Sequence, residues 1–263
     1  MGRAGLGLAL AGALAASSAS AAAPPDWTGV WGLQGGTIFD RATAEPPNAQ
    51  AGQPGAREHP PYNPAWEAKY RANIEKVKAD HFPDPITACG IPVGFPRIFN
   101  APDGYEFVVT PQQTWILTEN GPNVLRIYTD GRQHPKPEDM WPTYTGDSVG
   151  RWEGDTLVFD TIGLKGEAGT IVDRTGIVLS DKAHGVTRLR KVAPDLIEAQ
   201  ITLDDPVAFT GPWRVTKRFR RIPGDVRILD YACAENNRNP VDPATGKTLT
   251  LDTNGKPIDL DRR

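Results

Sequence analysis

Apolar and polar residues alternate with a period of two along most of the chain after residue 97. Successive side chains of a strand point to opposite faces of its sheet, so this alternation predicts strands with one buried face. Strands are expected at residues 105–110, 114–119, 124–129, 148–152, 156–162, 184–192, 196–203, 213–221 and 226–232, after a short first strand within residues 27–32. Many short strands in succession indicate an antiparallel arrangement.

Residues that favour turns separate these strands. Tight turns are predicted at residues 101–104, 120–123, 153–155 and 223–225, where glycine, proline, asparagine and aspartate tolerate hairpin geometry. So many strands leave exposed edges unless the sheet closes into a barrel or folds into two packed sheets, and we favour the barrel. The predicted fold class is therefore mostly β: an antiparallel, lipocalin-like β-barrel with one N-terminal helix and long loops.

One helix is predicted over residues 64–80. Asn63 is a suitable N-cap, Pro64 suits the first helical position and Glu67 adds an early acid. Four apolar residues follow at helical spacing: Trp66, Tyr70, Ile74 and Val77. This stripe either packs onto the body of the protein or offers a platform for a ligand, and we favour packing. Residues 35–61, before the helix, are predicted to form a long surface loop.

The N-terminal segment has the three parts of a secretory signal peptide. A positive charge at Arg3 precedes an apolar run over residues 6–16 and small residues over 17–21. The run is shorter than the roughly 20 residues that a membrane-spanning helix needs. We therefore predict a signal peptide over residues 1–21, a single barrel domain over residues 22–237 and a polar C-terminal tail over residues 238–263. The mature protein is expected to be periplasmic or secreted.

The two cysteines, Cys89 and Cys233, are far apart in the sequence. An oxidising compartment favours a disulfide bond between them, which would stabilise the fold by roughly 4 to 5 kcal/mol on a chain-entropy argument. Two buried free thiols are the alternative. A metal site is a weaker interpretation, because two cysteines without a histidine at ligand spacing form an incomplete shell.

Charge and motifs exclude several classes of function. The chain has 29 Lys and Arg residues against 32 Asp and Glu residues, and removal of Arg3 leaves 28 against 32, a net charge of −4. Nothing in this balance attracts nucleic acid or an anionic membrane. The histidines, at positions 59, 81, 134 and 184, show no metal-ligand spacing, and neither a nucleophile elbow nor a glycine-rich phosphate loop occurs. We expect no metal and no other cofactor, and a small molecule as the partner.

Titratable and aromatic residues are concentrated between residues 128 and 155. Near the mouth of a barrel, such residues supply the groups needed for acid–base chemistry. His134 is a candidate base, Asp130 its orienting partner and Arg132 a counterion for developing negative charge. In the alternative interpretation Asp130 and Gly131 form only a turn, and His134 is a surface residue. The further candidate catalytic residues are Tyr144, Asp147, Asp160 and His184, and the candidate ligand-binding residues are Trp115, Tyr128, Trp141, Trp152, Glu235 and Asn236.

Asp160 and Asp230 each share a predicted strand face with apolar residues. If that face points into the barrel, burial raises the pKa of the carboxyl group and makes it a proton donor. If it points outward, the carboxylates pair with arginines of a neighbouring strand such as Arg218 or Arg220, and we favour this outcome.

Four motifs resemble those of a family of exported, mostly uncharacterised bacterial proteins. They are Cys-Gly-x-Pro-x-Gly-x-Pro-Arg at residues 89–97, Ile-Tyr-Thr-Asp-Gly-Arg-x-His-Pro at 127–135, Gly-x-Ser-Val-Gly-Arg-Trp-Glu-Gly-Asp-Thr-Leu-Val at 146–158 and Cys-x-Glu-Asn-Asn at 233–237. The resemblance covers most of the mature chain and implies that these segments share a site, without implying a particular reaction. Gly29-Val30-Trp31 also resembles the Gly-x-Trp that opens a lipocalin barrel, with Arg218 available to stack on the indole.

Two classes of function agree with these features. The first is an exported enzyme that performs acid–base chemistry without a cofactor, as a lyase, isomerase or hydratase, on a small aromatic, terpenoid or sugar-like molecule. The second is a lipocalin-like protein that binds an apolar ligand without chemistry, and a purely structural envelope protein comes third. The clustered Asp, Arg and His residues favour the enzyme. In the first two classes, we expect the segment around His134 and Trp152 to face one enclosed hollow in the barrel.

Overall fold

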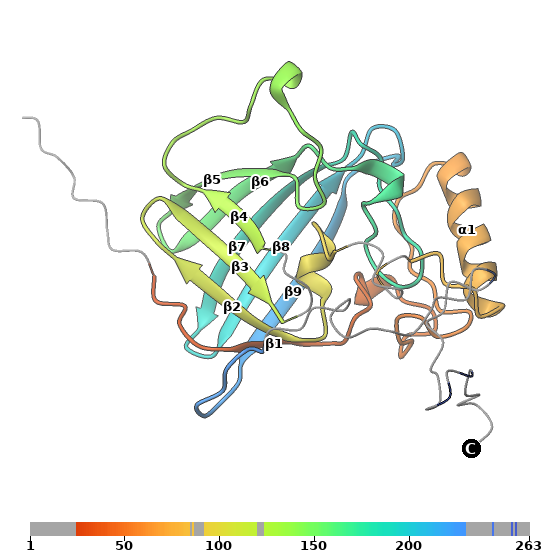
Figure 1. The fold of residues 1–263 in the computed structure, drawn as a ribbon, viewed down its shortest axis with the longest axis horizontal. Helices are drawn as coiled ribbons and strands as arrows, with labels where there is room; N and C mark the ends of the chain where they lie inside the picture. The colour runs from red at the N-terminus through yellow and green to blue at the C-terminus, as the bar shows by residue number, and fades with distance from the viewer. Residues whose placement is uncertain are drawn as a thin grey trace, which may run out of the picture.

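The computed structural model describes residues 25–84, 86, 92–119, 124–229, 244, 254 and 256. Within these residues, nine strands form one closed barrel in which each strand lies beside its neighbours in sequence (Figure 1). The strands are β1 (Trp31–Leu33), β2 (Gly104–Val109), β3 (Gln113–Thr118), β4 (Val124–Tyr128), β5 (Asp147–Glu153), β6 (Thr156–Ile162), β7 (His184–Ala193), β8 (Leu196–Asp204) and β9 (Trp213–Arg221). The prediction of a mostly β barrel is confirmed.

The strands β2 to β9 lie within one residue of their predicted bounds, and β6 and β9 match them fully. The strand predicted over residues 226–232 is wrong for its described part, because residues 226–229 pair with no strand. Pairing of β9 with β1 closes the barrel and leaves no edge for a further strand. Accordingly, Leu229 is 71% exposed. The predicted signal peptide, the turn at residues 120–123 and most of the predicted tail lie outside the described residues.

One pair of neighbouring strands departs from the antiparallel arrangement. β4 and β5 run in parallel, with Ile127 beside Ser148, so the prediction of an antiparallel sheet is wrong here. A parallel pair requires a connection that returns the chain to the end where the first strand began. Residues 129–146 make this connection, which forms the large green loop at the top of Figure 1.

The predicted helix forms as α1 (Pro64–Lys78), beyond one end of the barrel (Figure 1). Oδ1 of Asn63 caps it by accepting the backbone N–H groups of Ala65 and Trp66, both at 3.2 Å. The four residues of its apolar stripe are buried, so the stripe packs onto the protein. Short 3-10 helices lie in the connections: η1 (Arg41–Thr43), η3 (Arg97–Asn100), η4 (Pro137–Asp139) and η5 (Gly166–Ala168). None of the helices in the described residues has the length and hydrophobicity needed to cross a bilayer.

Aromatic and aliphatic side chains fill the interior of the barrel. The ring centroids of Tyr105 and Phe219 lie 4.7 Å apart, and those of Phe107 and Phe219 lie 5.6 Å apart, both pairs edge to face. At one end Phe99 of η3 reaches in and stacks on Phe159, with 6.5 Å between centroids. Such contacts add to the large apolar area that these rings bury. The inward side chains of the described strands therefore form the hydrophobic core rather than the wall of a hollow.

Phe95 covers the same end of the core and depends on a glycine opposite to it. A Cβ added to Gly185 of β7 would lie 2.4 Å from two carbons of the Phe95 ring, far inside van der Waals contact. Phe95 in turn contacts Phe99 edge to face, with 6.2 Å between centroids. Gly185 thus leaves the space in which the aromatic side chains close the barrel.

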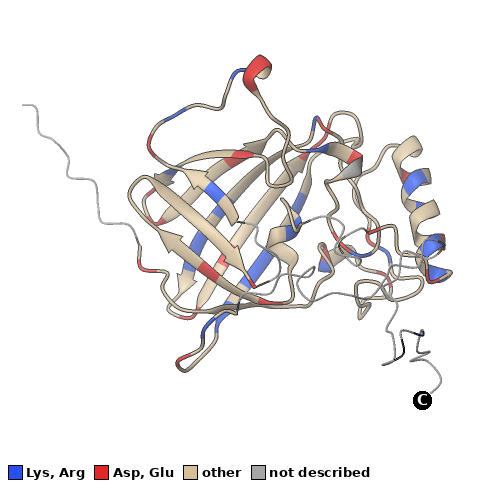
Figure 2. Ribbon diagram, in the orientation of Figure 1, with Lys and Arg blue, Asp and Glu red and all other residues tan. Residues whose placement is uncertain are grey.

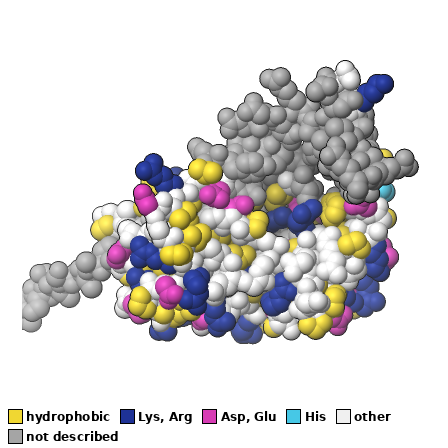
Figure 3. All heavy atoms as spheres, turned by 90° about the horizontal axis from the view of Figure 1, so that it is seen from below, with side chains coloured by type: hydrophobic (Ala, Val, Ile, Leu, Met, Phe, Trp, Pro, Cys, Tyr) yellow, Lys and Arg dark blue, Asp and Glu magenta, His cyan; other side chains and the backbone are white. Residues whose placement is uncertain are grey.

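The outer surface carries acidic and basic residues side by side (Figure 2 and Figure 3). Arg218 belongs to this surface, because its guanidinium lies 2.9 Å from the carboxylate of Glu198 across the β8–β9 pair. The prediction that Arg218 stacks on Trp31 is therefore wrong. Trp31 is fully buried and donates its indole N–H to the backbone oxygen of Trp27.

Shortening Phe219 to alanine should lower the free energy of unfolding by about 3 to 5 kcal/mol, because the change removes a ring from a closed core that cannot collapse fully. Val192→Ala, on the outer face of β7 where Val192 is 38% exposed, is the control and should change the free energy by less than about 0.5 kcal/mol. Denaturant unfolding measures both. Equal effects of the two substitutions would contradict a solid interior.

Candidate functional site

His134 lies on the outer face of the barrel, on the connection between β4 and β5. On β6, Leu157 and Phe159 belong to the core, so Asp160 points outward. Nε2 of His134 lies 2.9 Å from Oδ2 of Asp160, and Nδ1 lies 2.5 Å from Oδ1 of Asp147 on β5. The structure thus brings three of the predicted catalytic residues together. The expectation that this segment faces a hollow inside the barrel is wrong.

Both ring nitrogens of His134 are therefore engaged by carboxyl groups of the barrel strands. Nε2 of His184 lies 3.4 Å from the same oxygen of Asp160 and has no hydrogen-bond partner among the described residues. The partners of Asp160 are thus histidines rather than Arg218 or Arg220.

Asp130 pairs with Arg132 and not with His134. Nε of Arg132 donates to the two carboxylate oxygens of Asp130 at 2.9 and 3.0 Å, and Nη2 donates to Oδ2 at 2.6 Å. These hydrogen bonds lower the pKa of Asp130 and raise the pKa of Arg132. The guanidinium also lies 3.9 Å from the ring centroid of Tyr128. The prediction that Asp130 orients His134 is therefore wrong, because its carboxylate is engaged across the turn at Gly131.

The predicted ligand-binding aromatic residues do not share one surface. Trp115 lies on the outer side of β3, where Arg126 is 5.7 Å from its ring centroid. Trp152 turns inward and meets Trp27 with 5.3 Å between centroids. Trp141 is 82% exposed, and it lines a shallow surface pocket with Pro142, Tyr144 and Lys165. Five predicted residues lie outside the described residues: Cys89, Asp230, Cys233, Glu235 and Asn236.

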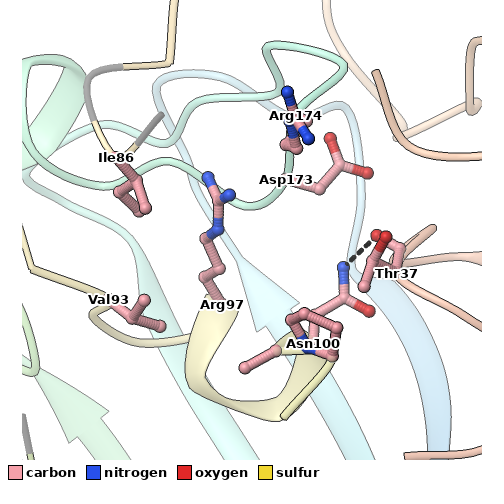
Figure 4. Close-up of a pocket in the computed structure, with 9 residues that line it drawn as sticks. Thr37, Ile86, Val93, Arg97, Asn100, Asp173 and Arg174 are labelled. Carbon is pink, nitrogen blue, oxygen red and sulfur yellow. Dashed lines mark hydrogen bonds between the residues drawn. The ribbon is translucent and has the colours of Figure 1, made fainter. Parts of the chain in front are cut away.

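A cavity of about 420 Å³ lies beside η3, among the loops beyond the end of the barrel. The residues labelled in Figure 4 form much of its described wall: Thr37, Ile86, Val93, Arg97, Asn100, Asp173 and Arg174. Its volume is in the range of small-molecule sites, and its wall combines an apolar patch with a few charged groups, as such sites do. This cavity is the second candidate site, and none of the described residues that line it was a predicted site residue.

Two buried carboxyl groups meet at the wall of this cavity. Glu58 and Asp173 are 0% and 1% exposed. Burial, together with the negative charge of Asp173 and a hydrogen bond to it, raises the pKa of Glu58 well above its ordinary value. With both groups ionised, Oδ2 of Asp173 has no hydrogen-bond donor among the described residues, and a proton on Glu58 supplies one. The pair therefore shares a proton and carries one negative charge.

Fixed donors hold both carboxyl groups in place. The two oxygens of Glu58 accept the backbone N–H groups of Phe39 and Asp40 at 3.1 and 2.5 Å. Oδ1 of Asp173 accepts the backbone N–H and the hydroxyl of Thr175 at 2.8 and 2.6 Å. These bonds hold both carboxyl groups from the outside, and the proton on Glu58 is then the donor for Oδ2 of Asp173.

Tyr70 of α1 connects the two loops that carry the pair. Its hydroxyl accepts the backbone N–H of Glu58 at 2.9 Å and donates to Oγ1 of Thr175 at 3.1 Å. Burial, and to a smaller extent the charge of Asp173, raises the pKa of Tyr70. Its hydroxyl therefore keeps the proton that it donates to Thr175. The helix thus fixes the spacing of the carboxyl groups.

A buried lysine lies next to the same cavity. Lys217 of β9 is 4% exposed, and its Nζ donates to Oδ1 of Asn100 at 2.6 Å and to the backbone oxygens of Ile38 and Phe39 at 2.9 and 3.2 Å. Burial lowers the pKa of Lys217 to about 8, against the opposing effect of nearby carboxylates. Its bond to Asn100 positions a residue of the cavity wall.

The sequence contains one signal for this site. In β9 the inward positions run through Val215, Lys217 and Phe219, and a lysine among apolar residues needs buried acceptors. No comparable signal marks Glu58 or Asp173, because they lie in two irregular loops and share no motif. Their proximity follows from the packing of α1 against the end of the barrel.

Known proteins supply no guide to the assignment. No family model, no curated protein and no solved structure matches the chain. The choice between the two candidate sites therefore rests on geometry: His134 is enclosed by its own ion pairs on the outer face, whereas Asp173 lines a cavity and pairs with the buried Glu58.

Replacing His134 with glutamine should loosen the connection over residues 129–146, because glutamine lacks the two ring nitrogens that reach Asp147 and Asp160. We expect faster backbone amide exchange there and a loss of up to about 1 kcal/mol of stability, since the pair is partly exposed to solvent. His59→Gln, which removes a histidine from another ion pair, with Glu45, is the matched control. Unchanged exchange in the His134 variant would show that the connection is held by other contacts.

The shared proton gives the folding stability a pH dependence. Folding raises the pKa of Glu58 above its value in the unfolded chain, which is near 4.5. Below pH 4.5 the carboxyl group is protonated in both states and contributes its full stability. As the pH rises from there toward the pKa of the folded state, this contribution to the free energy of unfolding is lost. Asp173→Asn keeps the acceptor for Thr175 and removes the like charge, so the fall in unfolding free energy above pH 4.5 should be smaller than in the parent protein.

Urea unfolding at a series of pH values measures this slope. Asp181→Asn, at an exposed carboxylate, is the control and should leave the slope unchanged. Parallel curves for the parent protein and the Asp173 variant would contradict a shared proton.

Proposed function

We propose that the protein is an exported enzyme that performs acid–base chemistry without a cofactor on a small molecule held in the cavity beyond the barrel end. One observation carries the proposal: Asp173 lines the cavity and is hydrogen-bonded to a buried Glu58 whose pKa is raised. Enzymes commonly use a pair of carboxyl groups with different pKa values as general acid and general base at neutral pH. Asp173 is the proposed base and Glu58 the proposed acid.

The proposed reaction conserves atoms and charge within the site. Asp173 removes a proton from a substrate carbon next to a carbonyl group, and the electron pair of that bond moves onto the carbonyl oxygen. Glu58 holds the second proton of the pair and returns one to the substrate at another position, with Asp173 as the relay. An isomerisation of this kind needs neither an oxidant nor a metal.

The His134 cluster remains a weaker candidate for catalysis. A general base needs a free lone pair, and both ring nitrogens of His134 are engaged by carboxylates. We propose instead that the ion pairs fasten the connection over residues 129–146 to β5 and β6. That connection also supports the cavity, because the backbone oxygen of Tyr144 accepts the N–H of Phe95, close to Val93 and Arg97.

Export is supported by the N-terminal sequence. A charged start, a short apolar run and a small-residue segment over residues 1–21 have the order of a cleavable signal. The resemblance of four motifs to exported bacterial proteins supports the same location, which is periplasmic or secreted.

A lipocalin-like binding protein is the alternative. The closed barrel and the Gly29-Val30-Trp31 segment at its start favour this interpretation. A lipocalin-like carrier holds its ligand inside the barrel, however, and here rings such as Phe107 and Phe219 occupy that space. A carrier built on this chain would therefore also use the cavity beside η3.

Solvent-isotope exchange tests the proposed reaction even while the substrate is unidentified. A mixture of small carbonyl compounds is incubated with the protein in D₂O, and mass spectrometry detects deuterium at carbon. Asp173→Asn should reduce incorporation by about a hundredfold to ten-thousandfold, the usual contribution of a general base, while Asp181→Asn should retain it. If His134→Gln abolished deuterium incorporation while Asp173→Asn retained it, the reaction would take place on the outer face of the barrel. Ligand binding without incorporation would support the carrier.

A further inference from the structure

Among its described residues, the wall of the cavity has more basic than acidic side chains. Arg97 and Arg174 are the basic residues, and Asp173 is the acidic one. Immediately behind the wall, Lys217 and Asp84 carry opposite charges and bind Asn100 and Arg97. An occupant with a single negative charge therefore neutralises the cavity.

Arg97 is held ready to bind such an occupant. Its side chain is only 11% exposed, and its Nη1 lies 2.7 Å from Oδ2 of Asp84, whose side chain is fully buried. Figure 4 shows the guanidinium between Ile86 and Asp173. A guanidinium has five N–H donors, of which one is used in a bond to Asp84 among the described residues. Its planar fork matches the two oxygens of a carboxylate, and an orientation fixed in advance reduces the entropic cost of binding.

The same wall offers an apolar contact for the rest of the molecule. Val93 is 3% exposed, and Ile86 packs against the hydrophobic core. Both side chains lie on the far side of Arg97 from Asn100 and Thr37 in Figure 4. A ligand that fits this wall has one anionic end and one hydrocarbon part.

We infer that the substrate is a small monocarboxylic acid. Arg97 binds the carboxylate, Arg174 adds a second positive charge, and the hydrocarbon part lies against Ile86 and Val93 within reach of Asp173. The carboxylate is the group by which the molecule is held, and the proton moves at another carbon. The reaction rests on the proposed function, whereas the binding preference is independent of turnover.

Four probes of equal chain length test the preference: hexanoate, hexanamide, hexylamine and hexyl phosphate. Isothermal titration calorimetry with the purified protein at pH 7 should show hexanoate binding about tenfold or more tightly than hexanamide, the factor expected for a charge-assisted hydrogen bond. Hexylamine should bind most weakly, because its charge is repelled. Hexyl phosphate should bind less tightly than hexanoate, because its second negative charge has no counterion at the wall.

Two variants assign the preference to this cavity. Arg97→Gln should remove the preference of hexanoate over hexanamide, and Arg174→Gln, at an exposed position, should reduce it by about threefold. Since Arg97→Gln removes the ion pair with the buried Asp84, Arg97→Lys is measured beside it. The Arg97→Lys variant keeps the positive charge but loses the paired N–H donors of the guanidinium. It should therefore bind hexanoate less tightly than the parent protein does. Lys76→Gln, on the exposed side of α1, should change nothing.

The outcomes separate this inference from the proposed function. Any one of four results would overturn the inference. They are equal affinity for hexanoate and hexanamide, tightest binding of hexylamine, no binding of hexanoate, and a preference for hexanoate that survives in both Arg97 variants. Isotope exchange on neutral carbonyl compounds would then leave the proposed function standing. A carboxylate preference lost in Arg97→Gln, without isotope exchange on any acid, would uphold the binding and reject the enzyme.

Discussion

The filling of the barrel by aromatic rings is the constraint on which the rest of the structure depends. Tyr105, Phe107 and Phe219 meet edge to face inside, and Phe95 and Phe99 close one end. A core at this density leaves no room for a ligand and no water for a charged group. Polar chemistry is therefore displaced to the outer face and to the loops beyond the closed end, and both candidate sites lie there.

The loops beyond that end are ordered by buried polar groups rather than by hydrophobic contacts alone. Taking Glu58, Asp173 and Lys217 out of water is costly, and the cost is offset only because backbone and side-chain partners surround them. Such a network fixes the loops in one arrangement, since any other would leave a buried group unpaired. The carboxyl pair that orders the loops is also the pair proposed to move protons, so structure and proposed chemistry share their residues.

The sequence predicts the barrel well because alternation reports directly which side chains of a strand are buried. It does not report which strand lies alongside, so the parallel pairing of β4 with β5 and the absence of pairing at residues 226–229 could not be foreseen. The same distinction applies to the sites. The sequence names His134, Asp147 and Asp160 as candidates, but it pairs His134 with Asp130 and Asp160 with arginines, and the face that they occupy depends on the filled core. The meeting of Glu58 with Asp173 depends on where α1 packs, which no local pattern encodes.

The short strand β1 has a consequence for the order in which the chain can fold. Both of its partners follow it in the sequence, and one of them, β9, is the last strand of the barrel. Pairing over so long a separation carries a large loop-closure entropy and slows folding. Until β9 has been synthesised, Trp27 and Trp31 have no closed core to enter, so a nascent chain carries exposed indoles that a holding chaperone can bind. The last strand to be made thus determines when the first can be buried.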